Sequence, residues 1–183
     1  MASVFRIQNY EPKSSESYFL DTNIWIYLFC PIANSKRHEQ NIYSNFFKLL
    51  TQSDHMIFVS SLILSEFANR YLRIDFDLWK KSTSNYSADY KRDFVGSNHF
   101  LNTVSDVKQA LKMILTKSER ATDDFNAINL DNVLSEFGKS DFNDSYYLTL
   151  AKSKKWKIVT HDADFFKDNS RDVDIITANI SKT

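Results

Sequence analysis

Short apolar runs that alternate with helical patterns constrain the fold of this chain more than any other feature. Four runs have the length and composition of buried strands: YFL at 18–20, MIFV at 56–59, KWKIVT at 155–160 and DIIT at 174–177. Alternating strands and helices predict an α/β sandwich with a mostly parallel central sheet. Right-handed crossovers in such a sheet bring the carboxyl ends of all strands to one edge, where ligands bind.

Four acidic residues stand close to these predicted strand ends. Asp21 directly follows the first run, Asp162 follows KWKIVT, and Glu66 lies on the helix after MIFV. Asp144 lies near the start of the helix that leads into KWKIVT. Carboxylates gathered at one edge repel one another unless a cation or a proton lies among them. A hard dication is the expected occupant, and hydrolysis of a phosphodiester is the expected chemistry.

Each of these acids also has a purely structural interpretation. Asp21 fits a helix N-cap, and Asp162 fits a polar turn after a strand. Glu66 fits a solvated helix face, paired with Arg70 four residues on.

Asp144 has two interpretations of equal weight. It could form a capping box with Asp141 at the start of the predicted helix 141–154. It also heads an inward-facing stripe that continues through Tyr147, Leu148 and Ala151. An unpaired buried carboxylate is costly, so this second interpretation requires a partner for Asp144. The convergence of four acids on one predicted edge favours function over structure for the set.

The remaining segments predict one domain with an insertion of unusual length. A chain of 183 residues fits one domain with a substantial core. The stretch from about 74 to 140 has helical patterns and no convincing strand, and we interpret it as a helical elaboration. Its polar part at 80–99 is expected to be a loop or a loosely packed helix end. Further helices are expected at 24–30, 36–51, 61–73, 103–117 and 125–137, and residues 1–16 are expected to form an arm before a single domain at 17–183.

Composition excludes several classes of function. Two glycines and two prolines leave no room for a Gly-rich phosphate loop. A net charge of zero argues against broad coating of nucleic acid. The single cysteine, Cys30, cannot form an intrachain disulfide, and the N-terminal residues have no apolar leader segment. No apolar stretch approaches the length that spans a membrane. We therefore expect a cytoplasmic protein.

Three segments that carry the acids resemble the PIN-domain nucleases, particularly the VapC-type toxins of type II toxin–antitoxin systems. FLDTNIW at 19–25 is similar to the first family motif, and SSLILSEF at 60–67 to the second. FNDSYYLTLAKSKKWKIVTHDADF at 142–165 is similar to the third and fourth motifs joined. The matching segments cover about half of the chain. The resemblance implies a PIN-like three-layer α/β/α sandwich whose family acids are Asp21, Glu66, Asp144 and Asp162.

The resemblance also implies an activity and partners. The expected activity is that of a metal-dependent endoribonuclease, with Mg²⁺ or Mn²⁺ held by Asp21, Asp144 and Asp162. Glu66 is expected to orient a metal-bound water or to complete a second metal site. An RNA substrate, a cognate antitoxin and a homodimer are the partners that the resemblance implies. The long central segment, the N-terminal arm and the basic run KSKKWK in place of a glycine depart from the family pattern.

Alternative functions and further groups stay open at this point. A non-catalytic PIN-like scaffold for protein interactions is the main alternative. A haloacid-dehalogenase-type phosphatase is disfavoured because Asn23 stands where that family has a second aspartate. His161 could act as a general acid, although strand alternation favours a structural or solvent-facing side chain. Basic groups for RNA are available in two runs, most of which we interpret as solvated charges: Lys80, Lys81, Lys91 and Arg92, and Lys152, Lys154, Lys155 and Lys157 around Trp156.

Overall fold

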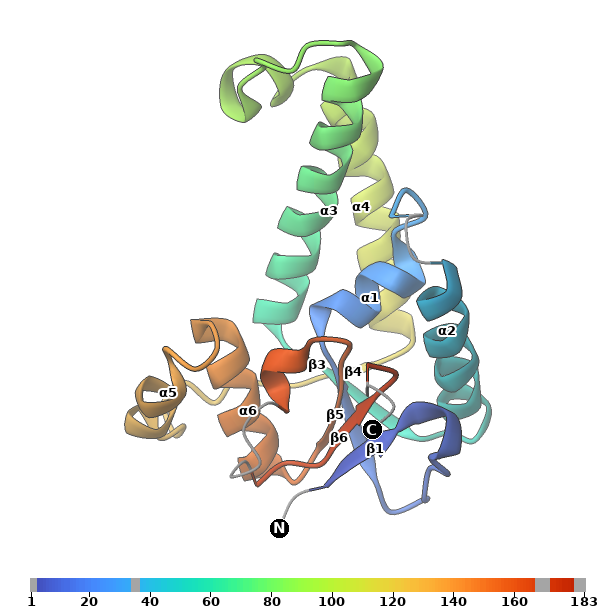
Figure 1. The fold of residues 1–183 in the computed structure, drawn as a ribbon, viewed down its shortest axis with the longest axis vertical. Helices are drawn as coiled ribbons and strands as arrows, with labels where there is room; N and C mark the ends of the chain where they lie inside the picture. Colours follow the sequence, from blue (N-terminus) through green and yellow to red (C-terminus); the bar gives the residue numbers. More distant parts are fainter. Residues whose placement is uncertain (1–2, 34–36, 167–171, 180–183) are drawn as a thin grey trace.

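A six-stranded, entirely parallel sheet forms the centre of the protein (Figure 1). The computed structural model describes residues 3–33, 37–166 and 172–179. The strand order is β1-β6-β5-β2-β3-β4. The strands are β1 (Val4–Arg6), β2 (Ser17–Leu20), β3 (Met56–Val59), β4 (Glu119–Arg120), β5 (Lys157–Val159) and β6 (Ile175–Thr177). The parallel sheet predicted from the apolar runs is confirmed.

Helices cover this sheet as outer layers (Figure 1). The helices α1 to α4 pack on one another, while α5 and α6 pack together with α6 against β5. Their bounds are α1 (Thr22–Phe29), α2 (Arg37–Gln52), α3 (Ser61–Ser82), α4 (Asn98–Thr116), α5 (Leu130–Glu136) and α6 (Phe142–Lys154). The arrangement is the three-layer α/β/α sandwich that was expected. Within the part of the chain that the structure describes, no helix has the length and apolar character needed to cross a membrane.

The point where the chain reverses its direction across the sheet lies between β2 and β5. From β2 the chain moves to its neighbour β3 and then to β4, whereas β5 and β6 lie on the other side of β2. Open parallel sheets bind their ligands at the carboxyl ends of the strands beside such a reversal. Asp21 follows β2, and Thr160 to Asp162 follow β5. The topology therefore directs attention to these residues before any chemistry is considered.

Two strands lie where the sequence predicted none. The expected N-terminal arm contributes β1, which pairs with β6 at one edge of the sheet. The expectation that residues 74–140 contain no strand is wrong, because β4 pairs with β3 at the opposite edge. Both residues of β4 are exposed, so they carry none of the apolar pattern by which strands are recognised.

The central elaboration is a helical hairpin that projects from the body of the molecule (Figure 1). The helix predicted at 61–73 extends to Ser82 and packs against α4. The connection between the two helices includes a π-helical turn, η3 (Tyr90–Phe94), and Phe94 is fully buried. The predicted loop or loosely packed helix end at 80–99 is present at 83–89, whose residues are mostly exposed, whereas the turn at 90–94 is more tightly packed than expected. Aromatic side chains pack around Phe94 and close the tip of the hairpin. The sequence pattern alone does not predict these contacts.

Candidate active site

Asp21 and Thr160 are neighbours because of strand register. Leu20 of β2 pairs with Val159 of β5, and the Asp21 N–H donates to the Val159 carbonyl at 3.0 Å. The next residue on each strand is Asp21 on one side and Thr160 on the other. The Thr160 hydroxyl donates a 2.7 Å hydrogen bond to Asp21 Oδ2 across 139 residues of sequence. The sequence analysis identified Asp21 as a candidate, and the parallel pairing of β2 with β5 brings Thr160 to it.

The Asp21 side chain serves the site rather than the helix that follows it. Asp21 occupies the N-cap position of α1, but its carboxylate makes no capping hydrogen bond to that helix. Its Oδ2 accepts instead from the Asn23 side-chain amide and from Thr160. Asn23 in turn accepts a 3.2 Å hydrogen bond from the His161 N–H, which ties the two strand ends together. The capping interpretation of Asp21 is thus not supported.

Burial sets the protonation of Asp21. The residue is 5% exposed, and the pKa of its carboxyl is raised from 3.8 to about 7, mainly by desolvation and also by the charges of Glu66 and Asp162. The hydrogen bond from Thr160 acts in the opposite direction, because it stabilises the charged form. The donors that contact Asp21 are neutral groups. The carboxylate therefore lacks a cationic partner among the described residues.

Asp144 lies in the same electrostatic neighbourhood. Desolvation raises the pKa of Asp144 to about 8, and the charges of Asp21, Asp141, Asp162 and Glu66 contribute in that order. The Asp144 backbone N–H donates a 2.9 Å hydrogen bond to Asp141 Oδ1, so Asp141 caps α6. The capping hydrogen bond uses the backbone N–H of Asp144. The carboxyl group of Asp144 takes no part in the cap, and its pKa responds to the charges of the other acids.

Glu66 turns toward α6 rather than toward its own helix. Its Oε2 accepts hydrogen bonds from Tyr147 Oη at 2.9 Å and from Asn143 Nδ2 at 3.3 Å. No ion pair joins Glu66 to Arg70, so the expected helix-face pairing is absent between these two described residues. Glu66 thereby links α3 to the first turn of α6, where Asp144 lies. The sequence analysis placed Tyr147 on the inward stripe but did not identify its hydroxyl as a partner of Glu66.

Asp162 is the most exposed of the four acids. Its Oδ1 accepts a 2.9 Å hydrogen bond from the Asp164 N–H and caps the short helix η4 (Ala163–Phe165). The predicted polar turn is therefore present, anchored by the fully buried Phe165. The Asp162 N–H donates to the Thr160 hydroxyl at 2.9 Å. Asp162 also lines an open hollow together with Asn23, Tyr27, Arg70, His161 and Asn179.

His161 is held by tyrosines at the rim of this hollow. Its Nδ1 lies 3.1 Å from Tyr43 Oη, and its ring meets the rings of Tyr27 and Tyr43 edge to face. Tyr43 Oη also donates to the Thr160 carbonyl at 3.0 Å. These contacts agree with the structural role that strand alternation favoured for His161.

The donors at this site fit a hard dication in kind, because Mg²⁺ and Mn²⁺ prefer carboxylate oxygens. Asp21 offers a buried carboxylate that only neutral donors contact, which is the electrostatic condition a cation relieves. Among the described residues, however, no three acidic, histidine or cysteine groups lie close enough together to hold one ion. Mg²⁺ commonly takes one or two carboxylates and fills its other positions with water and substrate phosphates. The arrangement therefore suits a partly hydrated ion rather than an ion enclosed by protein.

Comparison with known proteins agrees with this geometry. A family model for the PIN domain matches residues 18–170. The chain belongs to the PIN domain family. PIN domains are nucleases, and they generally use divalent metals. The matched range contains Asp21, Glu66, Asp144 and Asp162.

Solved structures are similar to this chain at low sequence identity. One is VapBC2 from Rickettsia felis, bound to a DNA fragment from its promoter, with a TM-score of 0.53 and 18% identity. That match covers 88% of this chain and 98% of the other. Another is PAE2754 from Pyrobaculum aerophilum, with a TM-score of 0.43, 15% identity, and coverage of 91% and 93%. No curated protein sequence matches this chain.

Proposed function

We propose that this PIN-domain protein is a divalent-metal-dependent endoribonuclease that cuts RNA at the carboxyl ends of β2 and β5. The observation that carries the proposal is the buried Asp21 carboxylate, which neutral donors and further acids surround. A chain that keeps such a group without its own cation favours an external one. Membership in a nuclease family supports the choice of phosphodiester hydrolysis.

Asp21, Asp144 and Asp162 are the proposed ligands of Mg²⁺ or Mn²⁺, directly or through water. When bound, such an ion lowers the pKa of a coordinated water and neutralises charge on the scissile phosphate. Thr160 and Asn23 fix the orientation of the Asp21 carboxylate by hydrogen bonds.

Glu66 has a different part in this scheme, because it accepts hydrogen bonds from Tyr147 and Asn143. These bonds hold its carboxylate in one position at the border between α3 and α6. A carboxylate fixed in this way can accept a proton from the attacking water. We propose this role for Glu66.

We further propose that the nuclease is the toxin of a toxin–antitoxin pair and acts in the cytoplasm. The likeness to the toxin chain fold in VapBC2 supports this assignment, together with the motif resemblance around Asp21 and Asp162. An antitoxin would block the site by covering it, and a homodimer is the proposed assembly. Co-expression with the product of an adjacent small reading frame tests the pairing, because a cognate antitoxin should co-purify and suppress cleavage.

The decisive experiment measures RNA cleavage by the purified protein. Structured RNAs should be cut in the presence of Mg²⁺ or Mn²⁺ and left intact with chelator. Asp21→Asn should lower the rate by at least about 100-fold, as the loss of one key electrostatic group in an active site does. Asp106→Asn is a matched control, because Asp106 is an exposed acid on α4 that makes no ion pair with any described residue. Intact RNA under every condition would instead favour the non-catalytic scaffold.

A further inference from the structure

A row of basic side chains runs along α3 from the acidic site toward the tip of the hairpin. Counted from Glu66, Arg70 and Arg73 follow at four and seven residues, and Lys80 and Lys81 at fourteen and fifteen. Residues at these spacings lie on one face of an α-helix. With Lys91 from the tip, we call Arg70, Arg73, Lys80 and Lys81 the basic face.

The inner end of the basic face belongs to the acidic site. Arg70 lines the open hollow that also contains Asp162 and Asn23. Glu66, one turn before Arg70 on the same helix, accepts hydrogen bonds from α6. The basic face therefore begins beside the proposed cleavage site and leads away from it.

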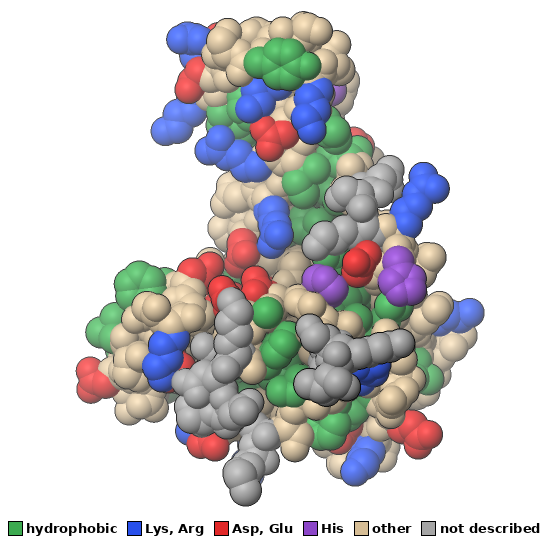
Figure 2. All heavy atoms as spheres, viewed as in Figure 1, with side chains coloured by type: hydrophobic (Ala, Val, Ile, Leu, Met, Phe, Trp, Pro, Cys, Tyr) green, Lys and Arg blue, Asp and Glu red, His purple; other side chains and the backbone are tan. Residues whose placement is uncertain are grey.

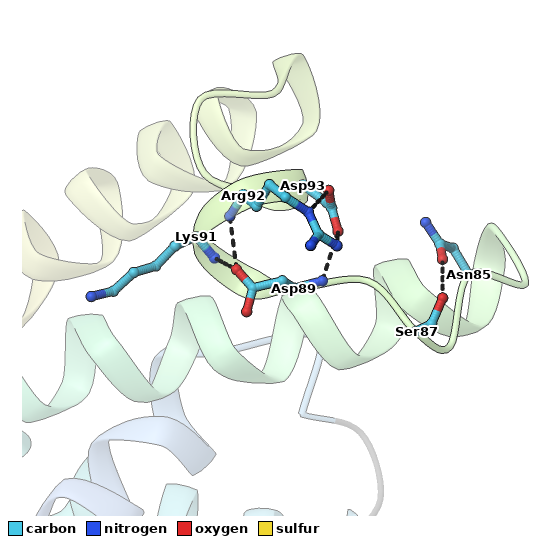
Figure 3. Close-up of polar contacts among 6 residues, drawn as sticks. All are labelled: Asn85, Ser87, Asp89, Lys91, Arg92 and Asp93. Atoms are coloured by element: carbon cyan, nitrogen blue, oxygen red, sulfur yellow. Dashed lines mark hydrogen bonds and ion pairs between the residues drawn. The ribbon is translucent and has the colours of Figure 1, made fainter.

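Specific contacts hold the outer end of the basic face in place. The Arg73 guanidinium lies over the Tyr90 ring, 3.8 Å from its centroid, which fixes the π-helical turn η3 against α3. Asp89 Oδ1 accepts hydrogen bonds from the N–H groups of Lys91 and Arg92, each at 2.9 Å (Figure 3). The Lys91 side chain extends away from this turn, as Figure 3 shows. The position of Lys91 is thus set by a capped and packed turn.

The acids of the hairpin are engaged, so the free charge on the basic face is positive. Residues 70–100 contain six Lys and Arg and four Asp. Asp77 pairs with Lys80 at 3.0 Å, and Asp93 pairs with Arg92 at 2.8 Å. Lys81 and Lys91 are exposed and make no ion pair with any described residue. Figure 2 shows Lys and Arg side chains along the hairpin and around its tip, with acidic side chains gathered at its base.

We propose that the basic face binds the phosphate backbone of the same RNA that is cut at the acidic site. Fourteen residues of helix span about 21 Å at 1.5 Å per residue, so the bound RNA extends about 20 Å beyond the scissile phosphate. The inference rests on the proposed function and adds a substrate requirement to it: the RNA must be long enough to reach Lys80, Lys81 and Lys91. The positive face also offsets the repulsion between RNA and the acids at the hairpin base.

The test measures RNA binding without cleavage. Fluorescence anisotropy in chelator gives the Kd of a labelled single-stranded RNA of about 20 nucleotides, longer than one groove needs. Lys81→Gln/Lys91→Gln should weaken binding about tenfold at low salt and reduce the slope of log K against log salt by about 1.4, because two phosphate contacts are lost. Lys108→Gln/Lys112→Gln on α4 removes the same charge from exposed positions outside the basic face and should leave Kd and slope unchanged. Thermal melting shows whether each variant is folded.

A short RNA of about four nucleotides, which cannot reach the tip, sharpens the test. The ratio of its Kd to that of the long RNA should fall about tenfold in Lys81→Gln/Lys91→Gln. If Lys81→Gln/Lys91→Gln leaves both the Kd ratio and the salt slope unchanged, the inference is overturned. That result would be expected if the tip bound an acidic protein partner instead. RNA that is bound through the basic face but never cut with metal refutes the proposed function and leaves only RNA binding by the basic face standing. If RNA is cut normally with metal while both double variants bind RNA with the same Kd, this inference is refuted and the proposed function stands.

Discussion

Two buried aspartates of this protein have opposite surroundings. Asp21 at the sheet edge and Asp75 in the hairpin are 5% and 7% exposed. Asp75 Oδ2 lies 2.9 Å from His99 Nε2 and accepts a 2.6 Å hydrogen bond from the Thr103 hydroxyl. The chain thus supplies Asp75 with a basic partner. Among the described residues, Asp21 accepts hydrogen bonds from neutral donors, including the side chains of Asn23 and Thr160, and further acids raise its pKa.

The difference separates a structural carboxylate from a functional one. A buried charge that serves only the fold is stable when its own chain pairs it. A carboxylate kept for a metal ion is left without a cation, and the folded protein then carries electrostatic repulsion that the ion relieves. The partners around a buried acid are therefore more informative than its burial.

The largest expected effect is a dependence of the free energy of unfolding on pH, which arises from the acids at the Asp21 site. The pKa of Asp21 rises from 3.8 to about 7 and that of Asp144 to about 8, so the folded state binds more protons than the unfolded state between these values. The free energy of unfolding of the metal-free protein should therefore fall as pH rises from about 4 to about 8, by roughly 4 kcal/mol from Asp21 alone at about 1.4 kcal/mol per pKa unit. Urea unfolding at a series of pH values in chelator measures this slope.

Measurements on two variants and with added Mg²⁺ show which groups cause the pH slope. Asp21→Asn should flatten it, whereas Asp77→Asn should leave it unchanged because Asp77 is an exposed acid. Mg²⁺ should restore stability mainly at the high-pH end, where the carboxylates are charged. An identical slope in wild type and Asp21→Asn would show that Asp21 does not titrate as described.

Asp75→Ala tests the paired side of the comparison. The substitution leaves His99 and Thr103 without their shared carboxylate and should lower the free energy of unfolding by about 2 kcal/mol. Asp77→Ala, on the same helix, should change it by less than about 0.5 kcal/mol because it removes only an exposed ion pair. Equal effects of the two substitutions in chemical denaturation would remove the distinction between a paired buried acid and a surface acid.

Thr160→Val changes the only hydroxyl that joins Asp21 to Asp162. The loss of its hydrogen bonds should lower the free energy of unfolding by about 1 kcal/mol. It should also move the titration of Asp21 to higher pH, because this hydrogen bond lowers the pKa of Asp21. The midpoint of the pH–stability curve reports the shift. Thr51→Val, whose hydroxyl bonds backbone carbonyls of its own helix, should leave that midpoint in place.

Asp144→Asn should act in the stabilising direction. Measured at pH 9 in chelator, the melting temperature should be preserved or raised, because the substitution removes the like-charge repulsion and the burial of a charged carboxylate that raise the pKa of Asp144. The α6 cap survives, since it uses the Asp144 backbone N–H. Asp141→Ala, which removes that cap, should lower the melting temperature instead. A large drop for Asp144→Asn would mean that its carboxylate serves the helix.

Much of the sheet follows from local pattern, while its edges do not. The apolar runs predicted β2, β3, β5 and β6, because a buried strand needs apolar side chains over its own short length. The edge strand β4 is formed by two exposed residues, and its pairing with β3 is a long-range contact without a local signal.

The partners of the candidate acids were the least predictable part of the site. The contact of the Thr160 hydroxyl with Asp21 depends on the register of β2 against β5. The contact of Tyr147 with Glu66 spans 81 residues and depends on how α6 meets α3. The packing of the hairpin tip around Phe94 was missed for the same reason.

The sequence by itself determined the four inner strands and most of the helices, that the strands run parallel, and that acids follow them. These properties depend on residue type and on spacing along a few neighbouring residues. Only the tertiary structure decided that Asp21 is buried without a cationic partner among the described residues, that Asp75 has His99 beside it, and that Arg70 to Lys81 lead away from the acids as one face. Burial and electrostatic interaction depend on distances between groups that are far apart in the chain, and those distances are fixed only when the sheet and its helices have packed.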